Sequence, residues 1–172
     1  MTLKDKAEKI RILIFDIDGV LTNGQIGFAG EEEVKLFHVR DGHGIKLARR
    51  AGYKVGALSG RSGKGNRRRA EELQLDFLHE GKKNKGEAFD ALLADLRAEP
   101  SECLYIGDDV IDIPILRKCG IGAVVADAPE YMGEYCDFRT KLPGGAGAVR
   151  EVIDWLLKET GKWQGLIKKY TE

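Results

Sequence analysis

The chain has 172 residues, enough for one well-buried domain, and its 28 basic residues balance 28 acidic ones. A formal net charge of zero gives no electrostatic reason to expect nucleic acid or a membrane surface as a partner. No apolar run approaches a membrane span and no secretory signal precedes Arg11, so we expect a cytoplasmic protein. The three cysteines are widely spaced and form no paired motif, as is typical of a reduced protein.

The first predicted strand, Arg11–Phe15, contains an apolar run and is expected to be fully buried. It ends in two carboxylates, Asp16 and Asp18, and Gly19 follows and can form a turn. Two acidic groups at the end of a buried strand indicate a site for a hard cation and a nucleophile with its proton shuttle. The alternative at this point is a strand end that is capped by solvated acids.

The segment Gln25–Val39 follows and contains two extended stretches around a loop that includes Gly30. Apolar residues alternate along the first stretch at Ile26 and Phe28, so the segment is predicted to be a β-hairpin. A lone two-stranded hairpin is barely stable in water. The hairpin therefore needs a surface to pack on, which is an argument for a partner subunit.

Strands and helices alternate along the rest of the chain. Four further strands are predicted at Lys54–Leu58, Asp76–Leu78, Cys103–Ile106 and Gly122–Val125. Five helices are predicted at about Gly44–Ala51, Gly65–Leu73, Lys85–Arg97, Ile111–Lys118 and Ala148–Thr160. This alternation predicts an α/β protein with a Rossmann-like parallel sheet and helices on both faces. We find no repeat or linker, and we expect a single domain over residues 1–172 with a tail from about 161 to 172.

Polar residues occupy the ends of these predicted strands. Ser59, Gly60 and Arg61 follow one strand, and Lys85 opens a helix. Another strand ends in Gly107 and a pair of acids, and a further acid lies one helical turn on; the acids are Asp108, Asp109 and Asp112. In an open parallel sheet, ligands bind at the carboxyl edge of the strands.

The four elements Asp16-x-Asp18, Ser59, Lys85 and Gly107-Asp108-Asp109 resemble, in order, the four motifs of the haloacid dehalogenase superfamily. Members with a cap domain insert it before or after the Ser59 motif, and neither interval has room for one here. The resemblance therefore implies a capless member. Such proteins act on macromolecules or have active sites that neighbouring subunits close.

Four segments narrow the resemblance to the capless sugar-acid phosphatases of that superfamily. They are Phe37–Gly44, Ser59–Arg61, Gly107–Pro114 and Gly144–Glu151. One departure is visible, because some members have Arg in the last loop where this chain has Ala146.

The resemblance implies a magnesium-dependent phosphatase that forms an aspartyl-phosphate on Asp16. Asp18 would protonate the departing alkoxide and then take a proton from water. The implied magnesium ligands are Asp16, the backbone carbonyl of Asp18, and Asp108. Oxygen ligands of this kind are the ones that Mg²⁺ prefers.

The remaining motif residues are expected to support this chemistry. Ser59 would donate a hydrogen bond to a phosphate oxygen, and Lys85 would stabilise the transferring charge. Asp109 and Asp112 are expected to orient Lys85 or metal-bound water.

For the substrate, Arg61 is the first choice to bind a carboxylate, because arginine offers a two-pronged donor group. The other candidate contacts are Arg40, Asp41, Gly60 and Arg69. A solvated basic face is an equal alternative for the Arg67–Arg69 run.

The implied substrate is 3-deoxy-D-manno-octulosonate 8-phosphate (KDO 8-phosphate), in lipopolysaccharide biosynthesis. A related nine-carbon acid, KDN 9-phosphate, is the nearer alternative, although its phosphatases carry Glu where this chain has Arg61. A non-catalytic interaction protein is the more distant alternative. The resemblance also implies a homotetramer in which the hairpins form a barrel and the tail reaches a neighbouring active site.

Overall fold

The structure is a computed structural model, and it describes residues 2–172. Its centre is a six-stranded sheet in the order β5-β4-β1-β6-β7-β8, and every neighbouring pair in it is parallel. The strands are β1 (Ile12–Phe15), β4 (Lys54–Leu58), β5 (Phe77–His79), β6 (Cys103–Gly107), β7 (Ile121–Val124) and β8 (Phe138–Arg139).

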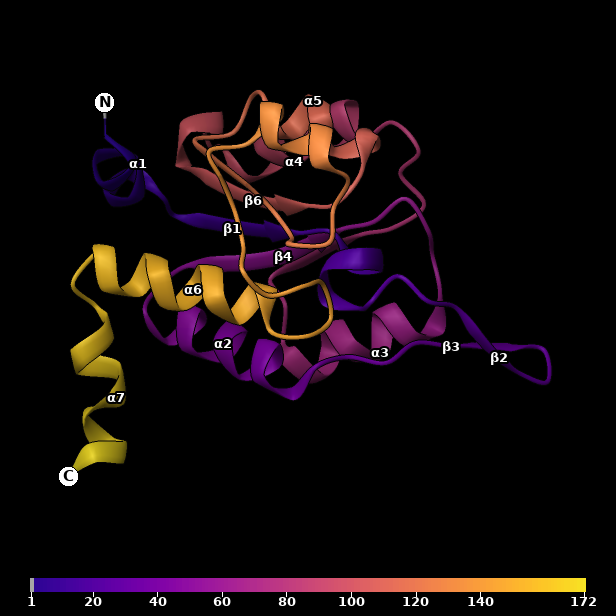
Figure 1. The fold of residues 1–172 in the computed structure, drawn as a ribbon, viewed down its shortest axis with the longest axis horizontal. Coiled ribbons are helices and arrows are strands. Elements are labelled where there is room, and N and C mark those ends of the chain that lie inside the picture. The colour runs from indigo at the N-terminus through magenta and orange to yellow at the C-terminus, as the bar shows by residue number, and fades with distance from the viewer. Residues whose placement is uncertain (1) are drawn as a thin grey trace.

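Helices cover both faces of the sheet, as predicted. Figure 1 shows α4 and α5 on one face and α2, α3 and α6 on the other. The helices are α1 (Leu3–Lys9), α2 (Val39–Arg50), α3 (Lys64–Leu73), α4 (Lys85–Leu96), α5 (Ile113–Leu116), α6 (Ala148–Glu159) and α7 (Trp163–Thr171). Short 3₁₀ turns occur at Pro100–Glu102, Val110–Asp112 and Glu130–Tyr135. Among the described residues, no helix combines the length and apolar character needed to cross a bilayer.

The core lies between the sheet and these helices. Every residue of β1 and β6 is buried, because the two strands occupy the middle of the sheet and are covered on both faces. The helices contribute one apolar stripe each; in α6 it includes Val152, Ile153 and Leu156. This packing holds the carboxyl ends of the central strands in place.

Strand order reverses direction between β1 and β6. From β1 the chain builds outward through β4 and β5, and it then returns to the other side of β1 and continues through β6, β7 and β8. The helices before and after such a reversal diverge, so a crevice opens at the carboxyl ends of the two strands. The first and fourth sequence motifs follow β1 and β6.

Two predicted helices differ clearly from the structure. The helix predicted from Gly44 begins at Val39, because Gly42 and Gly44 serve close packing and do not end the helix. A Cβ atom at Gly44 would collide with the side chain of Arg150 on α6. The helix predicted at Ile111–Lys118 is limited to α5, and α1, α7 and β8 were not predicted.

The hairpin is present but shorter than the predicted segment Gln25–Val39. It consists of β2 (Gly27–Ala29) and β3 (Glu32–Val34), which are antiparallel and protrude from the body of the molecule (Figure 1). Its apolar side chains are exposed, Phe28 at 74% and Leu36 beyond β3 at 77%. The described residues contain no separate cap domain.

Candidate active site

The four sequence motifs meet at the carboxyl edge of the sheet. Asp16 follows β1, Ser59 follows β4, Asp108 follows β6, and Lys85 is the first residue of α4. The sequence could place these residues at one edge, and there the structure brings Lys85 into contact with the carboxylates of Asp16 and Asp112.

Asp16 is 4% exposed, and both of its carboxylate oxygens are bonded. Oδ1 accepts the backbone N–H of Ile17 at 2.6 Å, and Oδ2 accepts from Lys85 Nζ at 2.6 Å. Burial raises the pKa of Asp16 to about 6, although the charge on Lys85 opposes the rise. The carboxylate is thus fixed in orientation at the floor of the site.

Lys85 lies between two carboxylates. Its Nζ donates to Asp16 and, at 2.6 Å, to Asp112 Oδ1. Burial alone would lower the pKa of Lys85, but the two carboxylates outweigh burial and raise it. The lysine is therefore a fixed positive charge beside Asp16.

Asp112 is fully buried and receives donors on both oxygens. Oδ1 also accepts the hydroxyl of Tyr105 at 2.6 Å, and Oδ2 accepts the backbone N–H groups of Asp108 at 2.9 Å and Asp109 at 3.2 Å. With this many donors, Asp112 holds Lys85 and the turn after β6 in position. Tyr105 is not predicted from the sequence, because a tyrosine inside a buried strand gives no signal of its polar contact.

Asp108 completes the acidic cluster. Carboxylate oxygens of Asp16, Asp108 and Asp112 lie within 4.8 Å of one another. Burial, followed by the charges of Asp16 and Asp112, raises the pKa of Asp108 to about 8. A buried carboxylate with like charges beside it fits a divalent cation, which would offset this repulsion. The carboxylate of Asp109 accepts the backbone N–H of Val110 at 2.7 Å. Its hydrogen bond is therefore to the backbone and does not orient Lys85.

The chain turns sharply after Asp18, through Gly19 at φ +85°. Only glycine fits at position 19, since a Cβ there would collide with the carboxylate of Asp108. The carboxylate of Asp18 is shielded from solvent, and its Oδ1 lies 2.7 Å from Nζ of Lys35. Sequence reasoning missed Lys35, because it lies in a hairpin segment with no motif.

Ser59 is 1% exposed, and its Oγ accepts the N–H of Arg61 at 3.2 Å, which shapes the loop after β4. A cavity of about 220 Å³ opens above these groups. It is lined by Asp16, Asp18, Gly24, Gly60, Arg61, Asp108, Asp109 and Ile111. Small-molecule pockets are typically about 300–1,000 Å³, so one chain provides only part of an enclosure for a sugar phosphate.

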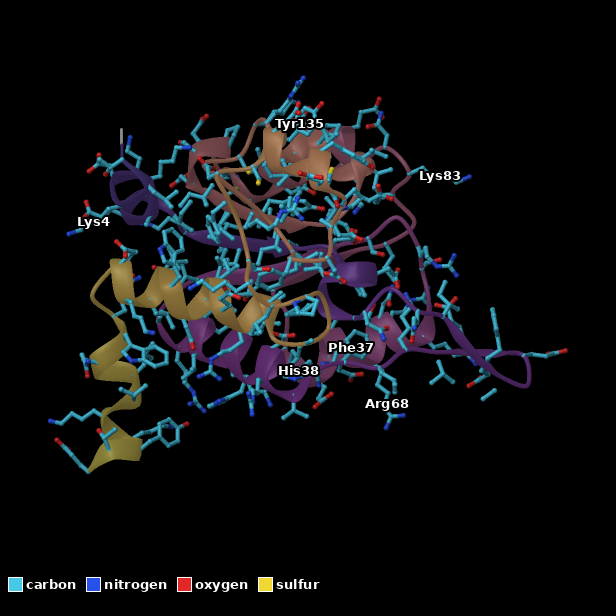
Figure 2. All side chains as sticks on the ribbon, viewed as in Figure 1. Lys4, Phe37, His38, Arg68, Lys83 and Tyr135 are labelled. Atoms are coloured by element: carbon cyan, nitrogen blue, oxygen red, sulfur yellow. The ribbon has the colours of Figure 1, made fainter. Side chains whose placement is uncertain are left out.

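Arg61 points to the hairpin, where its guanidinium donates to Glu33 Oε2 at 2.6 Å, and it is half exposed. Arg69 donates to Glu72 at 2.8 Å and to the backbone carbonyl of His38, and lies over the ring of Phe37. Arg69 therefore lies outside the cavity lining, and its neighbour Arg68 points into solvent (Figure 2).

Arg40 and Asp41 lie at the start of α2, away from the 220 Å³ cavity. Arg40 lines a different groove, together with Ala146 and Arg150. Asp41 is buried, and although it is remote in sequence it caps the N-terminus of α6. Its carboxylate accepts the N–H groups of Gly147 at 3.3 Å and Arg150 at 2.7 Å. Its carboxylate thus bonds within the chain, and a substrate contact for Asp41 stays a prediction.

The Gly144–Gly147 loop supports the turn that follows Asp16. Gly145 donates its N–H to the carbonyl of Val20 at 2.9 Å, and a Cβ at Gly144 would collide with the backbone of Gly19. Glycines here let the two loops approach closely. This loop is one of the four segments that carry the family resemblance, and in the structure it packs against the turn that follows Asp16.

The haloacid dehalogenase-like hydrolase family matches residues 28–120. The 3-deoxy-D-manno-octulosonate 8-phosphate phosphatase KdsC of Escherichia coli is 44% identical over 91% of this chain and 84% of its own length. A crystal structure of the Moraxella catarrhalis phosphatase, solved with magnesium, phosphate and KDO, has a TM-score of 0.94 at 35% identity and covers 97% of both chains. The crystal structure of the Yersinia pestis phosphatase has a TM-score of 0.91 at 38% identity. The match covers 95% of this chain and 89% of the Yersinia chain.

Proposed function

The chain belongs to the haloacid dehalogenase-like hydrolase family, and on that premise we propose that it is a magnesium-dependent KDO 8-phosphate phosphatase. One observation carries the reaction: the buried Asp16 carboxylate is held by Lys85 beside a second acidic group, Asp18, at the cavity. The substrate is taken from relatives of that name that match most of this chain. The products are KDO and inorganic phosphate.

In the first step, an oxygen of Asp16 attacks phosphorus and the bond from phosphorus to the sugar oxygen breaks. Asp18 gives its proton to the departing alkoxide. Lys85 carries the positive charge that faces the transferring phosphoryl group, and Ser59 offers a hydrogen bond to one of its oxygens.

In the second step, water attacks the phosphorus of the aspartyl-phosphate. Asp18 takes the proton from that water, and the bond between phosphorus and Asp16 breaks. Asp16 returns to a free carboxylate and phosphate leaves. The step needs Asp18 in the ionised form that the first step produced, so one side chain serves as acid and then as base.

Magnesium is the cofactor, and Asp16, Asp108 and the backbone carbonyl of Asp18 are the groups that would hold it. When bound, it offsets the repulsion between a carboxylate nucleophile and a phosphate anion. The raised pKa of Asp108 supports this assignment, because three carboxylates and one lysine leave excess negative charge at the site. Asp109 and Asp112 would act outside the metal ligands.

We place the enzyme in the cytoplasm, in KDO and lipopolysaccharide biosynthesis, and propose that it is a homotetramer. The support for assembly is the small cavity together with the exposed apolar side chains of the hairpin. Hairpins from several subunits can pair and leave no free strand edge. The tail helix α7 lies far from the active site of the same chain, at the opposite end of the sheet (Figure 1). It is held there in part by a hydrogen bond from Arg50 to Tyr170 at 3.2 Å.

The nearer alternative is a phosphatase of KDN 9-phosphate or a similar sugar acid. Arg61 argues against it, since those relatives carry Glu at that position. A non-catalytic protein on the same scaffold is the more distant alternative.

A substrate panel tests the proposal. Purified protein with magnesium is given KDO 8-phosphate, KDN 9-phosphate and common sugar phosphates, and phosphate release is measured. We expect KDO 8-phosphate to have the highest kcat/KM, and Asp16→Asn to lower turnover by about a thousandfold or more. Near-native activity of Asp16→Asn would contradict the mechanism, and a preference for another sugar acid would contradict the substrate.

A further inference from the structure

Lys35 lies just beyond β3, at the base of the hairpin, and its side chain is only 2% exposed. Its Nζ lies 2.7 Å from Asp18 Oδ1 and 3.4 Å from Glu33 Oε1, and it donates to Asn66 Oδ1 at 3.0 Å. The Asn66 contact is a hydrogen bond, and the two carboxylates are ion-pair partners of the ammonium group. These three groups come from the turn after β1, from β3 and from α3, so the ammonium is held from three directions.

Asp18, in contrast, depends on this single partner. Both of its carboxylate oxygens are shielded from solvent, and within residues 2–172 neither receives a hydrogen bond of good geometry. Lys35 is its one ion-pair partner in the same part of the chain. A shielded carboxylate without hydrogen bonds takes its orientation from the charge beside it.

We propose that Lys35 is a positioning residue for Asp18, which keeps that carboxyl group aimed at the bridging oxygen of the substrate. The inference rests on the proposed function, because it needs Asp18 to act as acid and base. Lys35 itself touches no reacting atom. Its contribution is largest when the sugar alkoxide departs, since that oxygen must collect a proton as its bond to phosphorus breaks.

The same contacts make the hairpin part of the site. Glu33 lies between Lys35 and Arg61, and it accepts a hydrogen bond from the Arg61 guanidinium at 2.6 Å. Asn66, which is 1% exposed, accepts from Lys35 and donates to the backbone carbonyl of Arg61 at 3.4 Å. A shift of the hairpin base would therefore move the group that orients Asp18.

The competing explanation is that Lys35 only ties the hairpin to α3. The two explanations differ in how the effect depends on the leaving group. Loss of a positioned acid slows the first step, which kcat/KM reports, for a substrate whose leaving group needs a proton. It spares that step for a substrate whose leaving group departs as a stable anion. A purely structural loss lowers both rates alike.

The test compares Lys35→Met with Lys64→Met, which removes an exposed ion pair to Glu32 on the same hairpin. KDO 8-phosphate supplies an alkoxide leaving group, and p-nitrophenyl phosphate supplies a stable phenolate. For Lys35→Met we expect kcat/KM on KDO 8-phosphate to fall about 30-fold or more, with kcat/KM on p-nitrophenyl phosphate changed by less than about threefold. Lys64→Met should change both by less than about twofold.

Two further variants keep the test decisive if Lys35→Met folds poorly. Lys35→Arg retains the charge and should recover most of the kcat/KM on KDO 8-phosphate. In an Asp18→Asn background, adding Lys35→Met should cause less than about a twofold further loss, because residues that act as a unit are not additive. The double variant also removes both members of the ion pair together, so neither charge is left unpaired.

Equal losses of kcat/KM on both substrates, or a large further loss in the Asp18→Asn background, would overturn the positioning role and leave Lys35 as a structural residue. Failure of the proposed function is recognised separately. In that case the unmodified protein with magnesium releases no phosphate from either substrate, and no variant is needed to see it.

Discussion

The floor of the site and the hairpin beside it are built in opposite ways. In the floor, Asp112 is fully buried, Lys85 is 1% exposed, and each carboxylate oxygen of Asp112 accepts hydrogen bonds. In the hairpin, Phe28 is 74% exposed and has no layer of its own chain to pack on. One chain therefore completes the polar floor, whereas the hairpin beside it keeps its apolar side chains exposed.

The difference follows from the number of neighbouring layers. The floor lies between two central strands of a sheet that has helices on both faces, so every polar group there must find a partner inside the chain. The hairpin has two short strands and one neighbour along its length, and it cannot bury its own side chains. The exposed apolar side chains of the hairpin can thus be changed separately from the floor, although Lys35 at the hairpin base contacts Asp18.

The largest effect is expected from Lys85→Met, which breaks the floor. Two buried carboxylates, Asp16 and Asp112, would lose their shared cation, and we expect a loss of about 3–5 kcal/mol in unfolding free energy. Turnover should fall by about a thousandfold, since Lys85 also faces the transferring charge. Denaturant unfolding and phosphate release measure the two effects.

The matched control is Lys118→Met, which removes a half-exposed pair with Asp90. Surface pairs of this kind contribute little, so stability and turnover should stay close to those of the unmodified protein. Similar losses in the two variants would show that the buried Lys85 contacts contribute no more than an exposed ion pair.

The second prediction breaks the hairpin and leaves the floor intact. Phe28→Ser combined with Leu36→Ser should convert the proposed tetramer to smaller species, because it removes exposed apolar surface available for pairing. We expect activity to fall by about tenfold to 100-fold, as water enters the open site. Light scattering measures the assembly.

Tyr131→Ser provides a control, because Tyr131 is exposed but lies outside the hairpin, in the Glu130–Tyr135 turn. It should leave both assembly and activity unchanged. A fully active monomer of the hairpin variant would refute closure by neighbouring subunits.

The third prediction concerns Arg61, which joins the two regions through Glu33. Arg61→Glu should weaken kcat/KM for KDO 8-phosphate by about tenfold to 100-fold, which corresponds to about 1.5–3 kcal/mol for one charge-assisted contact. The loss on p-nitrophenyl phosphate, which has no carboxylate, should be much smaller. Equal losses on the two substrates would assign Arg61 to phosphate binding or to the structure.

The smallest expected effect is a pH dependence of the stability of the metal-free protein, which arises at Asp108 in the floor. Asp108 has a pKa raised from the usual 3.8 to about 8 by burial and by neighbouring carboxylates. The folded protein therefore binds this proton more tightly than the unfolded chain, and the metal-free protein should lose stability as the pH rises from about 4 to about 8. Magnesium binds the deprotonated form, so its stabilising effect should grow over the same interval.

Thermal melts with saturating magnesium and with chelator check this dependence. The difference in Tm should be several degrees larger at about pH 8 than at about pH 6. Asp108→Asn should remove most of the dependence. A magnesium effect that is the same at both pH values would contradict the assignment of the raised pKa to the metal site.

Sequence alone determined the architecture and the polar edge. Alternating strands and helices predicted a parallel sheet, and the carboxyl ends of parallel strands share one edge, so Asp16, Ser59 and Asp108 had to lie near one another. Strand boundaries were predicted to within a residue or two, because short buried apolar runs leave little choice of position. The hairpin was predicted too, although longer than β2 and β3.

Only the tertiary structure decided which polar groups pair. Lys35 contacts Asp18, Asp41 caps α6, and Tyr105 bonds Asp112, and nothing in the local sequence announces these contacts. The physical reason is that local pattern reports which side of an element is buried, not which side chain of another element it meets there. A buried lysine is identical in sequence to a solvated one until packing brings an acceptor to it, and that packing depends on the whole chain.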